Sequence, residues 1–100
     1  MLLMDKGYQF ELTFVKFLES ERIRRGLTHL RFGDLLFPGY SKPVDRWNRL
    51  KLILKPGSKK GDYQPLALLE VISIAEKLGM DFDHLIWHVT QLVKADKGMR

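Results

Sequence analysis

The side chains best suited to specific recognition of another molecule are two arginines near the middle of the chain, Arg46 and Arg49. An arginine can pair through two hydrogen bonds with the edge of a guanine or with a phosphate group, so both are predicted to contact a nucleic acid. Ser41 and Lys42 lie at the start of the same predicted helix, where backbone N–H groups attract phosphate. Asp45 could accept a hydrogen bond from cytosine, but we favour a capping role or an ion pair with Arg49 one turn later.

The distribution of charge indicates an anionic partner. The formal net charge is +5, yet the segment 22–60 holds eleven basic and two acidic residues, a net charge of +9, while the rest of the chain carries −4. Basic residues that only keep a protein in solution, or that line a solvated helix face, need no such concentration. The pattern therefore favours a polyanion such as double-stranded DNA. Three loop lysines are expected to touch backbone phosphates without reading sequence: Lys55, Lys59 and Lys60.

Other chemistries find little support in the sequence. The absence of cysteine excludes disulfides, thiolate metal sites and cysteine nucleophiles, and it fits a reducing cytoplasm. His84 and His88 have the i, i+4 spacing of paired metal ligands, but without a third ligand we predict neither a metal site nor a cofactor. No motif places a histidine and an acid around a serine, and no glycine-rich phosphate loop is present, so we do not expect an enzyme.

Two further features predict a cytoplasmic protein without membrane association. No apolar run reaches the roughly 18–20 residues that cross a bilayer. The first eleven residues, MLLMDKGYQFE, lack the basic region and the long apolar region of a signal peptide.

A small fold must position these side chains. A chain of 100 residues, 45% hydrophobic and 29% charged, is enough for one domain with one core, spanning 1–100. Apolar residues recur at helical spacing, and no segment shows the alternation of a half-buried strand. The prediction is an all-α domain of five helices, at about 8–25, 28–36, 41–54, 65–78 and 81–95.

Local signals define the region around the second predicted helix. Thr28 is a good N-cap, and Gly26 suits the left-handed position after a helix end. Gly33 in mid-helix costs about 1 kcal/mol relative to alanine, which suggests that another backbone packs closely there. Pro38 and Gly39 predict a sharp turn, because proline presets its φ and glycine can adopt a positive φ.

The later predicted helices each carry an apolar stripe. In the third, Val44, Trp47 and Leu50 face inward, which leaves Arg46 and Arg49 on the outer sides. The stripe of the fourth comprises Leu66, Leu69, Ile72, Ala75 and Leu78.

Trp87 falls off the apolar stripe of the last predicted helix. An exposed tryptophan is often an interface anchor. Packing against the N-terminal segment, at Leu2, Leu3 or Tyr8, is an equally good interpretation.

The predicted helices 28–36 and 41–54, with a compact turn between them, form a helix-turn-helix arrangement. In this arrangement the second helix lies in the major groove, which is about 12 Å wide, and the first helix crosses the DNA backbone. Gly33 would let the two helices cross closely. The polar start of the second helix would then reach base edges and phosphates.

The sequence also resembles a known family. The segments RIRRGLT (22–28) and QPLALLEVISIAEKLGMDFDHL (64–85), together with Gly33, Val44 and Trp47, resemble the lambda-repressor-like Cro/repressor (XRE) family of transcriptional regulators. The resemblance implies a compact five-helix domain that binds a palindromic operator as a homodimer and acts by occupancy. The bound dimer would block RNA polymerase, as a repressor, which is the interpretation we favour, or recruit it. The resemblance also implies phosphate contacts by Thr28 and His29.

The same resemblance implies where two chains would meet. The last helix lies near a two-fold axis in some dimers of the family, which would place Trp87, His88 and Gln91 at the interface. Two alternatives stay open. One is an antitoxin that binds a toxin protein and represses its own operon. The other is a protein-interaction module that kept the fold and lost DNA binding, although Arg46 and Arg49 argue against it.

Overall fold

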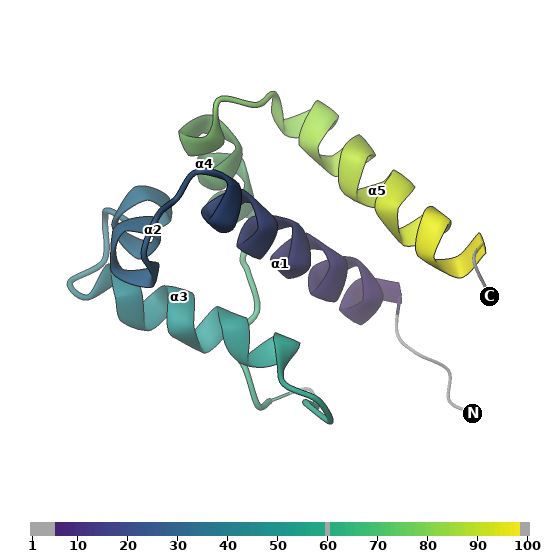
Figure 1. The fold of residues 1–100 in the computed structure, drawn as a ribbon, viewed down its shortest axis with the longest axis horizontal. Coiled ribbons are helices and arrows are strands. Elements are labelled where there is room, and N and C mark those ends of the chain that lie inside the picture. Colours follow the sequence, from purple (N-terminus) through teal and green to yellow (C-terminus); the bar gives the residue numbers. More distant parts are fainter. Residues whose placement is uncertain (1–5, 60, 99–100) are drawn as a thin grey trace.

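The computed structural model describes residues 6–59 and 61–98, and these residues form five α-helices and no β-strand (Figure 1). The all-α prediction is confirmed, and the predicted helix boundaries differ from the observed ones by up to three residues. The third helix ends at Lys51 and continues as a short 3-10 helix, and the fourth begins at Leu68 instead of Pro65. The elements are α1 (Lys6–Arg24), α2 (His29–Leu36), α3 (Pro43–Lys51), η1 (Leu52–Leu54), α4 (Leu68–Leu78) and α5 (Phe82–Gly98).

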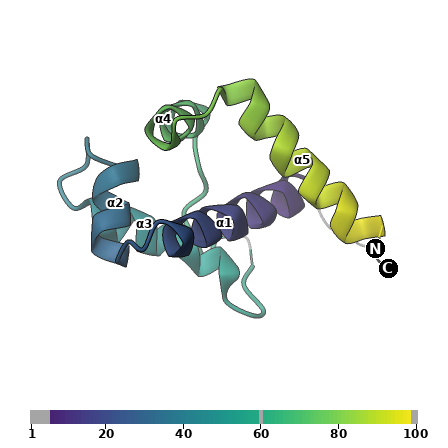
Figure 2. The ribbon, with the colours of Figure 1, turned by 45° about the horizontal axis from the view of Figure 1, so that its top comes forward.

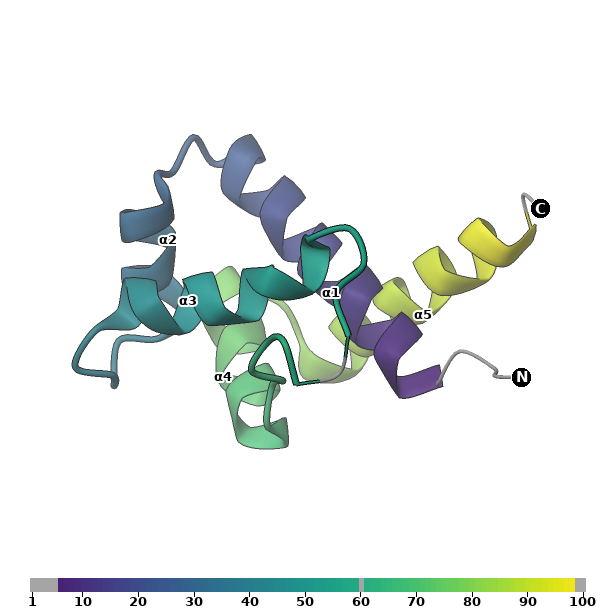
Figure 3. The ribbon, with the colours of Figure 1, turned by 90° about the horizontal axis from the view of Figure 1, so that it is seen from below.

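The long helix α1 runs through the middle of the molecule. It packs against α5 on one side and against η1 on the other, and α4 contacts both α2 and α5. Figure 2 shows α5 beside α1, and Figure 3 shows α3 and η1 on the face away from α5. The described helices include none that is both long enough and apolar enough to cross a membrane.

Trp47 lies at the centre of the core. It is fully buried, and the ring of Phe32 meets it edge to face with 5.0 Å between the ring centroids. Burial of each large apolar side chain contributes about 1.5–3 kcal/mol to folding. The other fully buried large side chains come from every helix: Phe14, Val15, Leu18, Leu36, Leu50, Ile53, Ile74, Leu85 and Val89.

The start of α2 has the predicted cap. The Thr28 hydroxyl accepts a hydrogen bond from the N–H of Arg31 at 3.1 Å, and Gly26 takes the left-handed conformation at φ +68°. Arg22 donates to the carbonyl of Leu27 at 2.8 Å, which ties the end of α1 to the connection. The two helices are therefore joined by a short, hydrogen-bonded link.

Gly33 marks a close contact between α2 and α3, as predicted. A Cβ at this position would lie 2.8 Å from the Cα of Val44, 2.9 Å from its nitrogen and 3.0 Å from the carbonyl carbon of Pro43. The predicted turn at Pro38 and Gly39 is present, although Gly39 does not have a positive φ. The N–H of Tyr40 closes the turn by donating to the carbonyl of Phe37 at 3.2 Å.

The predicted inward face of α4 is confirmed at Ala75 and Leu78, which are buried, and is wrong at Leu69 and Ile72. Leu69 is 80% exposed and Ile72 is exposed, whereas Ile74 lies in the core. The helix is apolar around most of its circumference, so its spacing alone does not choose a face. The carboxylate of Glu70 pairs with the buried Arg46, and this pair turns the side of α4 that carries Glu70 and Ile74 toward the core.

Candidate nucleic-acid interface

One side of α3 presents polar groups to solvent. Ser41, Lys42 and Arg49 are exposed, and Asp45 is half-buried beside them. The expected ion pair between Asp45 and Arg49 is not formed. These side chains line a small hollow of about 150 Å³ together with Tyr40, Arg46 and Gln64.

Arg46 is not on the outer side of α3, and the sequence-based placement is wrong. It is only 2% exposed, and its guanidinium donates twice to the carboxylate of Glu70, both times at 2.8 Å. The remaining donors reach the carbonyls of Gln64 at 3.0 Å and Pro65 at 2.8 Å. These bonds use every nitrogen of the guanidinium, so Arg46 joins α3 to the start of α4 and has no free edge for a base.

Glu70 makes the stability of this link depend on pH. Burial would raise the pKa of Glu70, but hydrogen bonds from Arg46, from the N–H of Ala67 and from Tyr40 outweigh it and lower the pKa from 4.5 to about 2. Between these two values the unfolded chain binds more protons than the folded chain. The stabilisation is therefore present above about pH 4.5 and is lost as the pH falls through 2.

As the pH is lowered from 5 to 2, we expect the contribution of Glu70 to the free energy of unfolding to decrease by about 3 kcal/mol. Urea denaturation across this range should show a smaller decrease for Glu70→Gln. Glu76→Gln, on an exposed position of the same helix, is the matched control. Burial raises the pKa of Glu11, so this group stabilises the folded chain as the pH falls and partly offsets the effect of Glu70. The assignment is therefore tested by the difference between the pH profiles of the two variants. Parallel pH profiles for the two variants would contradict the assignment.

The start of α2 contacts the end of α3 through His29. The indole N–H of Trp47 donates to Nδ1 of His29 at 3.1 Å, and Nζ of Lys51 lies 3.0 Å from the same nitrogen. Burial lowers the pKa of His29, and the charges of Lys51 and Arg22 lower it further. Thr28, which precedes it, is exposed and acts as the cap. The two residues assigned to phosphate contact are thus together at one helix start.

Only part of the basic segment is free of acidic partners. Arg22 pairs with Glu19 at 2.8 Å, and Arg24 and Arg25 both pair with Glu21, at 2.7 and 3.3 Å. With Arg46 held by Glu70, the net charge of the segment overstates what it can offer to a polyanion. Across residues 6–59 and 61–98, six basic residues of the segment have no ion pair: Arg31, Lys42, Arg49, Lys51, Lys55 and Lys59.

The loop after η1 carries the remaining candidates. Lys55 and Lys59 are exposed, and the backbone N–H of Lys59 donates to the carboxylate of Asp62 at 2.9 Å. Lys60 lies outside the described residues. The N–H of Gln64 donates to the carbonyl of Arg49 at 3.2 Å, so the end of the loop follows α3.

The candidate dimer residues are on α5. Trp87 is 58% exposed, and the ring of His84 stacks on it with 6.1 Å between the centroids. His88 and Gln91 are half-buried, and the ring of His88 meets Phe17 of α1 at 5.3 Å. Trp87 is exposed among the described residues, and both interpretations of it, an interface anchor and packing against the N-terminal segment, stay predictions. Leu2 and Leu3 lie outside the described residues, and the ring of Tyr8 packs against Tyr63.

Sequence reasoning missed three residues that lie at these sites: Asn48, Lys51 and Gln64. Asn48 is exposed on α3 beside Arg49, and Lys51 contacts His29 from one turn after Trp47. A buried tryptophan needs an acceptor for its indole N–H, and His29 at a helix start was a signal that could have suggested the contact. Gln64 gave no such signal, because only the path of the loop brings it to α3.

Comparisons of this chain with known protein families, with characterised proteins and with solved structures found no match.

Proposed function

We propose that this protein is a sequence-specific DNA-binding regulator in which α2 and α3 form a helix-turn-helix and α3 enters the major groove. The observation that carries the proposal is the contact at Gly33. The backbones of α2 and α3 meet there at a distance that no side chain would allow. Such close crossing lets the first helix hold the second at a constant angle, as docking in a groove requires.

The polar side of α3 supplies the groups that such docking needs. Arg49 and Asn48 are exposed and have the donors that recognise guanine and adenine edges, respectively. Lys42 and Ser41 at the start of α3, and Thr28 and His29 at the start of α2, would contact phosphates. Lys55 and Lys59 would add affinity that does not depend on sequence.

We further propose that two chains act together through α5, as the resemblance to lambda-repressor-like regulators suggests. The exposed Trp87 supports this, since exposed aromatic side chains are common interface anchors. Two copies would read a palindromic operator with half-sites about one turn, roughly 34 Å, apart. Occupancy of the operator would then repress transcription.

Arg49→Ala is expected to weaken binding to the preferred duplex about 5- to 150-fold, because a bidentate arginine–guanine pair contributes about 1–3 kcal/mol of discrimination. Duplexes would first be selected from a random pool, and affinity would be measured by fluorescence anisotropy across a salt series. Lys77→Ala removes a positive charge from α4 and is the matched control, expected within about twofold of the unsubstituted chain. The expected stoichiometry is two chains per duplex.

Enrichment of no sequence in the selection would contradict the proposal. Equal losses in Arg49→Ala and Lys77→Ala would show that only net charge matters. One chain per duplex would contradict the dimer.

A protein-interaction module is the second candidate, and one observation favours it. Leu68, Leu69 and Ile72 form an exposed apolar face at the start of α4, a feature more usual at a protein interface than on a free surface. A binding partner such as a toxin would be compatible with either candidate. The selection experiment separates the two, because a pure interaction module enriches no DNA.

A further inference from the structure

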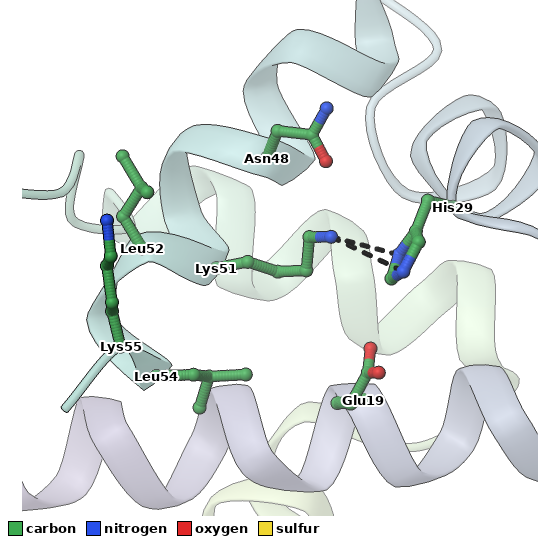
Figure 4. A pocket seen from close by; sticks show the side chains of 7 residues that line it. All are labelled: Glu19, His29, Asn48, Lys51, Leu52, Leu54 and Lys55. Carbon is green, nitrogen blue, oxygen red and sulfur yellow. Dashed lines mark hydrogen bonds between the residues drawn. The ribbon is translucent and has the colours of Figure 1, made fainter.

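A groove lies where α1 meets the end of α3 and η1 (Figure 4). Its volume is about 520 Å³, within the range of about 300–1,000 Å³ that holds small organic ligands. Polar groups with N–H donors and two leucines form its walls. The lining residues are Glu19, His29, Asn48, Lys51, Leu52, Leu54 and Lys55.

The protonation of His29 follows from its partners. The indole nitrogen of Trp47 can only donate, so Nδ1 of His29 accepts this bond with its lone pair and carries no proton. The ring proton of the neutral imidazole is then on Nε2. His29 therefore has one donor that the Trp47 contact does not use.

Lys51 lacks sufficient acceptors. Its ammonium group has three N–H donors, yet the only hydrogen-bond acceptor that the described residues provide is Nδ1 of His29, 3.0 Å away, because Nε2, at 3.5 Å, carries the ring proton. This Nδ1 is already bonded to Trp47. The ammonium is therefore partly buried without a matching negative charge.

Glu19 does not neutralise Lys51. Both of its carboxylate oxygens accept from Arg22, at 2.9 and 2.8 Å, and no ion pair joins Glu19 to Lys51. Figure 4 shows Lys51 extending across the groove toward His29, with Glu19 on the opposite wall. Burial lowers the pKa of Lys51, Glu19 raises it, and Arg22 lowers it. Two lysines and one carboxylate line the groove, and Arg22 already binds that carboxylate, so the charged groups of the lining are positive in sum.

We propose that this groove binds a phosphate group that carries an organic substituent. The phosphate oxygens accept from Lys51, from Nε2–H of His29 and from Lys55, and the substituent lies on Leu52 and Leu54. Leu52 is 41% exposed and Leu54 is half-buried, so both have apolar surface to cover. The phosphate belongs either to a free nucleotide or to a nucleic-acid backbone. The proposal does not depend on α3 reading DNA.

The pKa of His29 in the intact chain is the readout. Its ring protons would be followed by NMR across pH with AMP, inorganic phosphate or a short duplex at constant ionic strength. A bound phosphate adds negative charge beside a ring whose pKa is held down by Lys51 and Arg22, so AMP is expected to raise it. His84, on α5 and away from the groove, is the internal reference and should not respond.

Lys51→Met is expected to weaken AMP binding at least tenfold, and Lys77→Met is the matched control. Circular dichroism checks that each variant is folded, and Lys55→Met is a second variant on the exposed rim. If AMP raises the pKa of His29 at lower concentrations than inorganic phosphate does, the result supports the proposal with a free nucleotide as the source of the phosphate. If only the duplex raises this pKa, the result supports phosphate binding and identifies the nucleic-acid backbone as the source.

Equal responses to AMP and inorganic phosphate would overturn the role of the organic substituent. The proposed site would be contradicted if none of the three ligands changed the pKa of His29. It would also be contradicted if Lys51→Met and Lys55→Met both left the response to AMP unchanged. Arg49→Ala should leave the AMP response intact, so failure of the α3 interface and failure of the groove are distinguishable.

Discussion

Replacing Arg46 with alanine is expected to lower the free energy of unfolding by about 3 kcal/mol, since removal of one partner of a buried ion pair typically costs about 3–5 kcal/mol. The substitution leaves Glu70 and the carbonyls of Gln64 and Pro65 without the guanidinium that bonds all three. It also removes the cation that lies over the ring of Phe37, 5.3 Å from the ring centroid. Urea denaturation followed by circular dichroism measures the change.

Arg49→Ala is the matched control, because Arg49 lies on the same helix and is exposed. A surface substitution of this kind is expected to change the free energy of unfolding by less than about 0.5 kcal/mol. The two substitutions should therefore have different effects: Arg46→Ala should lower stability, and Arg49→Ala should weaken DNA binding. Similar stability losses for both would show that Arg46 is not held as described.

Gly33→Ala is the second large effect, an expected loss of about 2 kcal/mol in the free energy of unfolding. In a free helix the change would stabilise by about 1 kcal/mol, because alanine has the higher helix propensity. The new methyl group would meet backbone atoms of Val44 and Pro43 at 2.8–3.0 Å, and backbone cannot rotate away as a side chain can. The two helices must move apart, which also loosens Trp47 beneath them.

Gly39→Ala is the control for Gly33→Ala. A Cβ at this position would have no atom within 4 Å, and Gly39 does not have a positive φ. Alanine is expected to be neutral or to stabilise by up to about 1 kcal/mol, by restricting the unfolded chain. A Gly33→Ala variant as stable as Gly39→Ala would mean that α2 and α3 are not in backbone contact.

Features that depend on neighbouring residues were predictable from the sequence. Thr28 caps α2 through a bond three residues away, and Trp47 is buried because its spacing with Val44 and Leu50 defines a stripe. The contact at Gly33 was predictable because a glycine inside a helix lowers its stability, which suggests that another backbone packs closely there. These inferences use only local geometry, so they do not require the positions of distant helices.

Arg46 shows why the rest could not be predicted. On a helical projection it lies one turn before Leu50, at the edge of the stripe of Val44, Trp47 and Leu50, where a charged side chain is expected to reach solvent. Only the path of the loop after η1, which brings Gln64 and Pro65 over α3, covers it. The exposed side of α4 has the same explanation, because an acid facing a buried arginine overrides the apolar pattern. The groove at Lys51 likewise forms only when four elements are in place, because its lining residues come from α1, α2, α3 and η1.

The bonds from Arg46 also have a consequence for the entropy of any association at α3. They fasten the middle of α3 to residues 64–70, so the direction of the helix is already set in the free chain. A partner that docks on its exposed side has little conformational freedom to remove, and more of the contact energy remains as affinity. The acceptors at Gln64 and Pro65 are backbone carbonyls, so a change in the backbone path there can reorient the helix without altering any residue on it.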